Sequence, residues 1–160
     1  GAGRLAYAVA PAVMKSRAYA LTLDQSNFEK YAELRNHIET AYWDEAVALL
    51  TEEDKLELKN IVARALEKLH GKQVQVPHEE HRKLHLLIYS RLNNPFVTGL
   101  LEAYWNAYEA VGLNMYAGGI HYLEEVWVYH KTMVQSICNG NYAAGRKALI
   151  THIDLLAHRP

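Results

Sequence analysis

The chain has 160 residues, half of them hydrophobic, and its net charge is −1 with histidine counted as neutral. This length suits one domain with a real hydrophobic core, and the composition excludes an intrinsically disordered chain. The balanced charge gives no basic surface for nucleic acid, and the single Cys138 excludes an intramolecular disulfide and fits a reducing compartment.

Residues 1–25 show no sustained helical pattern and are predicted to be a linker. The apolar run from Leu5 to Met14 contains Pro11, and its basic residues follow it instead of preceding it. That order does not fit a signal peptide, and a membrane span needs about 20 apolar residues. Gly1-Ala2-Gly3 looks like a cloning remnant and there is no initiator methionine, so we expect a fragment whose beginning has been removed.

From residue 26 onward, apolar residues recur at helical spacing, and no segment alternates with the period of two that is typical of a strand. Thr51 and Asp54 form a capping-box pattern, Gly71 is a helix stop, and Asn139-Gly140-Asn141 is typical of a tight turn between two helices. The predicted helices cover residues 26–50, 51–70, 78–94, 96–116, 120–138 and 142–157. Short connections between them predict an all-α antiparallel bundle of about six to seven helices.

The apolar stripes of these helices are expected to form the core, and they include Phe28, Tyr31, Ile38, Ala46, Leu49, Leu56, Ile61, Phe96, Leu101, Tyr104 and Trp105. Arg35 interrupts the first stripe, four residues after Tyr31 and three before Ile38. Two interpretations are open. Its side chain extends to the rim of the core, or it is a partly buried guanidinium that binds an anion.

Four histidines lie on inward faces. His81 and His85 are four residues apart on one predicted helix, so they point the same way. His130 lies ten residues before Gly140 and His152 twelve after it, about 15 Å and 18 Å of helix respectively, which puts them at nearly the same height in an antiparallel hairpin. Neutral imidazoles that converge in an apolar interior suit a divalent transition metal. The alternative is that each one is a core histidine bonded to a carbonyl.

The other histidines and the acids beside the cluster are expected to be solvated. This holds for His37, His70, His78, His121 and His158 and for the neighbouring Glu79 and Glu80.

The order of these features resembles the C-terminal, FCD-type domain of the FadR-subfamily GntR transcription regulators. The matching features are Tyr31-Ala32-Glu33-Leu34-Arg35 followed by Glu39, the histidine helix ending in Asn94-Pro95, and His130 and His152 on either side of Asn139-Gly140-Asn141. The resemblance covers about residues 26–157. It implies an all-helical bundle that dimerises and binds a small effector in a central cavity. The effector is usually an organic acid, often beside a metal held by one aspartate and three histidines.

The resemblance places the family's three metal-binding histidines on His85, His130 and His152, and its aspartate on His81. This departure implies one of two alternatives. The first is a four-histidine site, which would favour zinc, nickel or cobalt over the harder manganese. The second is a vestigial pocket. Arg35 matches the arginine that commonly faces the effector, and a guanidinium can bind a carboxylate through two hydrogen bonds.

We therefore predict a sensor domain over residues 26–160 and not an enzyme. It is expected to be a cytoplasmic homodimer that binds a small carboxylate and no membrane. Residues 1–25 are expected to be the linker from a missing N-terminal winged helix-turn-helix domain, through which alone DNA is bound. One alternative is a metal-dependent hydrolase or oxygenase. Such an enzyme needs a general base near the metal, and the sequence has no inward carboxylate at helical spacing from the histidines. The other alternative is a metal-free interaction domain with structural histidines.

Overall fold

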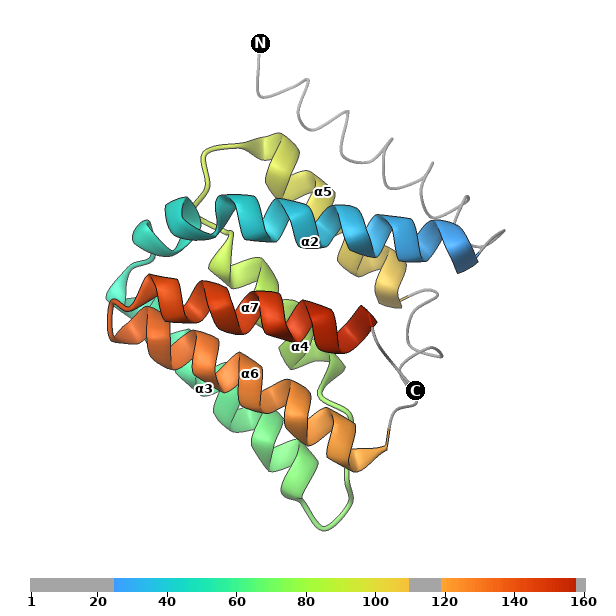
Figure 1. Cartoon of the computed structure of the whole chain (residues 1–160). Coiled ribbons are helices and arrows are strands. Elements are labelled where there is room, and N and C mark those ends of the chain that lie inside the picture. The colour runs from blue at the N-terminus through green and yellow to red at the C-terminus, as the bar shows by residue number, and fades with distance from the viewer. Residues whose placement is uncertain (1–24, 110–118, 158–160) are drawn as a thin grey trace. The chain divides into compact units, whose positions relative to one another are not determined.

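The computed structural model describes residues 25–109 and 119–157, and within these ranges the chain forms helices and no strands. The helices are α2 (Gln25–Ala48), α3 (Glu52–His70), α4 (His78–Ile88), α5 (Pro95–Ala107), α6 (Ile120–Cys138) and α7 (Tyr142–Ala157), shown in Figure 1. The all-α prediction is confirmed. The expected linker and the last part of the helix expected over 96–116 lie outside the described residues, and the central cavity stays a prediction.

The described residues divide into two compact units. The first unit comprises residues 25–39 and 92–109, and the second comprises residues 40–91 and 119–157. Helix α2 is shared, because its first part belongs to the first unit and its last part to the second.

Aromatic residues hold the first unit together. The ring of Phe28 on α2 stacks on that of Tyr104 on α5 with centroids 5.7 Å apart, and Tyr31 meets the same ring edge-on at 5.5 Å. The Tyr31 hydroxyl also donates a hydrogen bond to the carbonyl of Leu100 at 2.9 Å. Since all three rings are almost fully buried, these contacts fix α2 against α5.

The second unit is built around α6. This helix packs against α7 and α3, and α3 in turn packs against α4. Figure 1 shows α6 and α7 as an antiparallel hairpin drawn in orange and red. Gly140 makes the turn of this hairpin with φ of 73°, a conformation that strongly favours glycine, and the Asn141 side chain accepts a hydrogen bond from the amide of Ala144. The tight turn predicted at Asn139-Gly140-Asn141 is confirmed.

The capping box that begins α3 is also confirmed. The amide of Asp54 donates to the Thr51 hydroxyl at 3.2 Å, and the amide of Thr51 donates to the Asp54 carboxylate at 2.9 Å. These two bonds satisfy amide groups that an uncapped helix would leave exposed.

The histidine helix is shorter than predicted. Helix α4 ends at Ile88 instead of continuing to residue 94, and the hydroxyl and amide of Ser90 both turn back to the carbonyl of Leu87. Further along the chain, Asn94 caps α5 by accepting from the amides of Phe96 and Val97, so residue 94 begins the next helix instead of extending α4. Pro95 is the first residue of α5, where its missing N–H costs nothing.

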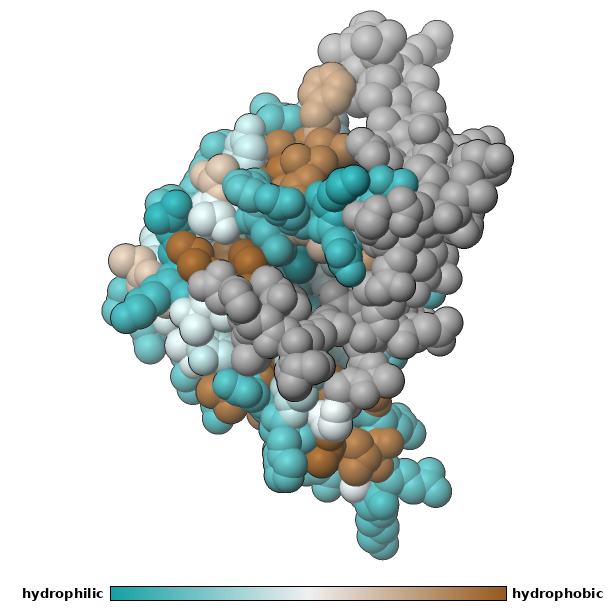
Figure 2. All heavy atoms as spheres, turned by 45° about the vertical axis from the view of Figure 1, so that its right-hand side comes forward, coloured by the Kyte–Doolittle hydropathy of each residue, from teal (hydrophilic) through white to brown (hydrophobic). Residues whose placement is uncertain are grey.

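Some residues expected in the core are exposed, namely Leu49, Leu56 and Phe96. On α3 the buried face instead includes Leu58 and even Asp54. Figure 2 shows exposed apolar residues as brown patches among hydrophilic ones on the face that it displays. In the described part of the chain, none of the helices combines the length and the apolar character that crossing a membrane requires.

Trp43 is a core residue that the sequence pattern missed. It is fully buried in the second unit, and its indole N–H donates to the carbonyl of Tyr142 at 2.9 Å. Gly145 faces the same ring, because a Cβ there would lie 2.6 Å from Trp43 Cζ2. Helix α7 can therefore approach α2 this closely only with glycine at position 145.

Candidate metal centre

The four inward histidines converge in the second unit. His81 and His85 come from α4, His130 from α6 and His152 from α7. Each histidine contributes one ring nitrogen, and these four nitrogen atoms all lie within 4.8 Å of one another. The structure thus brings together all four histidines that the sequence pattern selected, and in the described part of the chain this is the one cluster that could hold a metal ion.

The closest ring pairs join different helices. The His130 and His152 ring centroids are 4.3 Å apart, which places these two residues at the same height of the α6–α7 hairpin as their spacing from Gly140 predicted. The His81 ring lies 4.7 Å from that of His130, and Nε2 of His85 lies 3.1 Å from Nε2 of His130. Three of the rings are almost fully buried, with 1% exposure for His85, 0% for His130 and 1% for His152.

The donor set fits a small divalent cation that prefers nitrogen. In a tetrahedral zinc site each Zn–N bond is 2.0–2.1 Å, so neighbouring ligand nitrogens are about 3.4 Å apart. The observed 3.1 Å between His85 and His130 is close to this separation, and the 4.8 Å limit for the whole set requires only small ring movements. The four imidazoles therefore meet the ligand type, number and spacing of a zinc-like site.

Among the residues whose side chains the structure describes, the cluster contains no carboxylate. Two acids described as buried in the second unit, Asp54 and Glu80, are each paired with a basic residue, Arg91 and Lys68 respectively. The Trp127 ring lies 4.7 Å from His130 and covers one side of the cluster. A metal bound here would consequently keep its full double positive charge among neutral ligands and apolar walls.

The expectation for Glu80 was wrong. Glu79 is exposed and pairs with Lys83 on its own helix, but Glu80 is 4% exposed and receives Lys68 Nζ at 2.8 Å. Helix α4 turns Glu80 toward α3, and burial of the carboxylate is tolerated because an ammonium group from α3 meets it there.

Most of the remaining histidines lie where they were expected. His37, His70 and His121 are exposed, and His158 lies outside the described residues. His78 is half-buried, and burial, together with the charge of Lys68, lowers its pKa below the ordinary value. None of these belongs to the four-histidine cluster.

Arg35 lies in the first unit and is buried, with 3% exposure. Its guanidinium stacks over the rings of Tyr104 and Trp105, 4.8 Å and 5.5 Å from their centroids, and Nη1 lies 3.3 Å from a carboxylate oxygen of Glu39. The interpretation that Arg35 extends to the rim was wrong. The guanidinium is buried beside an anion, and in this structure that anion is a side chain of the same helix.

Glu39 is the charged residue of this region to which the sequence reasoning gave no role. It is fully buried and lies one turn after Arg35 on α2. The i, i+4 spacing of an arginine and a glutamate inside an apolar stripe was the signal that could have identified the pair.

Comparison with known proteins gives the family. The FCD domain family matches residues 30–155, most of the chain and nearly all of its described part. The chain belongs to the FCD domain family. This match confirms the identification as the C-terminal, effector-binding type of domain of GntR-family regulators. None of the curated proteins matches the chain.

Among solved structures, E. coli McbR/YncC has a similar fold, with a TM-score of 0.68 at 19% sequence identity. The similarity covers 82% of this chain and 62% of McbR/YncC, so the chain spans less than two thirds of that protein's length. At this identity the similarity supports the FCD fold and says nothing about which ligand is bound.

Proposed function

We propose that this domain senses a small carboxylate effector through a bound divalent metal. The metal would be held by His81, His85, His130 and His152. Zn²⁺ is the first choice, and Ni²⁺ and Co²⁺ are the alternatives. The observation that carries the proposal is the convergence of four imidazoles from three helices within 4.8 Å of one another. Single core histidines usually bond to a carbonyl, and four of them gathered in one buried place would be costly without a shared ligand.

The charge balance supports an anionic effector. Four neutral imidazoles leave a divalent cation uncompensated, and the acids described as buried in the second unit, Asp54 and Glu80, are held by Arg91 and Lys68. A carboxylate from solution would supply the missing negative charge. We also propose that Arg35 binds an effector carboxylate, since its guanidinium is preorganised on two aromatic rings.

Regulation, and not catalysis, is the role we assign. Membership of the FCD family points to a regulatory domain, and within the described residues the histidine cluster includes no carboxylate that could act as a general base. The alternative of a metal-dependent hydrolase or oxygenase is therefore not favoured.

The effector would act on DNA binding by shifting the populations of two packings of the bundle, each of which sets a different geometry of a homodimer. DNA would be bound only through a winged helix-turn-helix domain N-terminal to residue 26, and the protein would act in the cytoplasm. The match over residues 30–155 supports these proposals, because domains of this family are parts of DNA-binding transcription regulators.

A thermal-shift screen tests the proposed function. The chain is stripped of metal, reloaded with Zn²⁺, and mixed with a panel of mono-, di- and tricarboxylates. We expect at least one carboxylate to raise the melting temperature of the zinc-loaded protein and to have a much smaller effect on the metal-free protein. Equal shifts in both forms would contradict a role for the metal, and no shift with any carboxylate would contradict the effector class.

A further inference from the structure

Helix α3 contributes no histidine to the cluster, yet it supports two of the three helices that do. It packs against both α4, which carries His81 and His85, and α6, which carries His130. The position of α4 on α3 therefore determines how two of the four imidazoles face the third.

An ion pair fixes the beginning of α4. Lys68, near the end of α3, places Nζ 2.8 Å from one carboxylate oxygen of Glu80 and 2.9 Å from the other. The Glu80 side chain is 6% exposed and that of Lys68 is 33% exposed. Because Glu80 directly precedes His81, this contact holds the helix at the point where its first histidine leaves the backbone.

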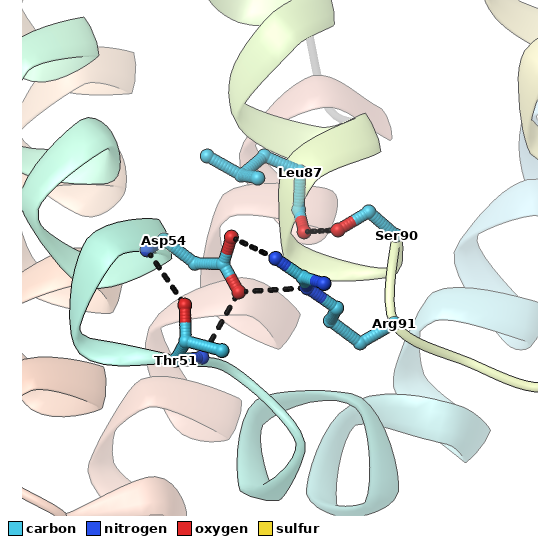
Figure 3. A network of polar contacts seen from close by, with 5 residues as sticks. All are labelled: Thr51, Asp54, Leu87, Ser90 and Arg91. Atoms are coloured by element: carbon cyan, nitrogen blue, oxygen red, sulfur yellow. Dashed lines mark hydrogen bonds and ion pairs between the residues drawn. The ribbon is translucent and has the colours of Figure 1, made fainter.

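A second ion pair fixes the chain just after α4. Arg91 donates from Nε to Asp54 Oδ2 at 2.9 Å and from Nη2 to Asp54 Oδ1 at 3.0 Å, in the two-pronged geometry shown in Figure 3. Asp54 is itself fixed, because its carboxylate also accepts the amide hydrogen of Thr51 in the capping box. Arg91 therefore binds a carboxylate whose position at the start of α3 is itself fixed by the capping box.

The two pairs lie at opposite ends of an antiparallel contact. The end of α3 meets the start of α4, and the start of α3 meets the segment that follows α4. With both ends held, α4 can neither slide along α3 nor rotate on it without breaking an ion pair. His81 and His85 lie between the two pairs.

We infer that the Lys68–Glu80 and Arg91–Asp54 ion pairs are positioning contacts for the metal centre: they hold α4 in the register that aims His81 and His85 at His130. This inference rests on the proposed function and extends it. It assigns part of the metal affinity to four residues that do not touch the metal and to a helix without a ligand.

The sign of the effect separates positioning from simple electrostatics. Removing the positive charge of Lys68 lessens the repulsion of a cation, so electrostatics alone predicts that Lys68→Gln binds Zn²⁺ more tightly. The positioning role predicts the opposite, a loss of about tenfold in Zn²⁺ affinity, as is usual when a supporting contact of a metal site is removed. Arg91→Gln removes the other ion pair and tests it by the same reasoning.

Neighbouring residues supply the controls. Glu79→Gln removes one negative charge from the same turn of α4 as Glu80→Gln, but the close ion pair of Glu79 is with Lys83 of its own helix. Arg64→Gln removes a positive charge from α3, where Arg64 pairs with Glu57 of the same helix. Neither control removes a hydrogen-bonded ion pair between α3 and α4, so both are expected to keep the wild-type affinity within about twofold.

The experiment measures Zn²⁺ affinity by competition with a chromophoric chelator at a temperature where circular dichroism shows each variant to be folded. Weaker binding in Lys68→Gln, Glu80→Gln and Arg91→Gln, with the controls unchanged, supports the inference. Should Glu80→Gln fail to fold, the more exposed Lys68 and Arg91 give the same test.

The Lys68→Gln/Glu80→Gln double variant adds a second criterion. We expect it to bind Zn²⁺ no more weakly than the worse of the two single variants, since both remove one contact. Wild-type affinity in Lys68→Gln, or tighter binding, would overturn the positioning role and leave the metal centre standing. A wild-type chain that binds no Zn²⁺ would overturn the proposed metal centre and this inference with it.

Discussion

Nε2 of His85 and Nε2 of His130 lie 3.1 Å apart and join α4 to α6 at the histidine cluster. Two ring nitrogens at this distance either share one proton or turn together toward a cation. The proximity of the His81 and His152 rings, 4.7 Å and 4.3 Å from that of His130, favours the second arrangement when a metal is available.

The first prediction concerns metal retention. His85→Ala and His152→Ala each remove one of four ligands from a buried site, and we expect purified protein to lose its bound metal. Elemental analysis measures the occupancy, and His121→Ala is the matched control because His121 is exposed and lies outside the cluster. Full occupancy in either cluster variant would show that the ligand assignment is wrong.

The second prediction concerns the choice of metal. His81→Asp replaces a neutral nitrogen ligand by a harder, charged oxygen ligand, which should raise the affinity for Mn²⁺ relative to Zn²⁺. Competition experiments with both ions would measure the ratio of their dissociation constants. A ratio that stays the same in the variant would mean that His81 is not a ligand.

The third prediction concerns the buried pair of the first unit. Arg35→Met removes the guanidinium that pairs with the fully buried Glu39 and should lower the free energy of unfolding by about 3–5 kcal/mol. The double variant Arg35→Met/Glu39→Met should recover most of this loss, because no buried charge remains. Urea unfolding of the wild type, both single variants and the double variant measures the coupling, and additive losses would argue against the pair.

Arg35→Met should also separate the roles proposed for Arg35 and for the metal. The variant is expected to keep its bound metal, because the four histidines lie on other helices, and to bind less tightly the carboxylate that gives the largest shift in the screen. Loss of the metal in a folded variant, or unchanged carboxylate affinity, would contradict the role given to Arg35.

A further prediction concerns pH. The hydrogen bonds from Arg91, and then from the amide of Thr51, lower the pKa of Asp54 from 3.8 to about 2. Since the folded state prefers the ionised carboxylate, the resulting stability is complete above about pH 4 and is lost as the pH falls toward 2. We expect Arg91→Gln to melt at a lower temperature than the wild type at pH 7, with a difference that shrinks between pH 4 and pH 2. A difference independent of pH in this window would exclude the Asp54 contact as its cause.

The last prediction concerns the close approach of α7 to α2. Gly145→Ala would put a methyl group 2.6 Å from Trp43 Cζ2, and this overpacking should cost about 1–3 kcal/mol of stability. Gly119→Ala is the control, since a Cβ at position 119 would meet nothing within 4 Å. Equal stability of Gly145→Ala and the wild type in chemical unfolding would mean that the ring moves aside freely.

Periodicity was sufficient to predict the helices and the histidine cluster. The i, i+4 spacing puts His81 and His85 on one face, and the matched distances from Gly140 put His130 and His152 at one height; the structure brings the two pairs together. Local signals, such as the Thr51–Asp54 capping box, also predicted structure correctly, because both partners lie within one turn.

Other contacts between helices could not be predicted in this way. The burial of Glu80 depends on Lys68, twelve residues away on α3. Leu56 is exposed because α3 presents a different face to its neighbours than its apolar pattern indicated. In each case the deciding partner belongs to another element, whose position only the tertiary structure supplies.

Elemental analysis of the purified protein, combined with thermal melting before and after a chelator, tests the central claim most directly. The four-histidine centre predicts about one equivalent of zinc, or of nickel or cobalt, per chain and a melting temperature that falls on chelation and returns when metal is restored. Absence of metal, together with an unchanged melting temperature when Zn²⁺, Ni²⁺ or Co²⁺ is added, would contradict it.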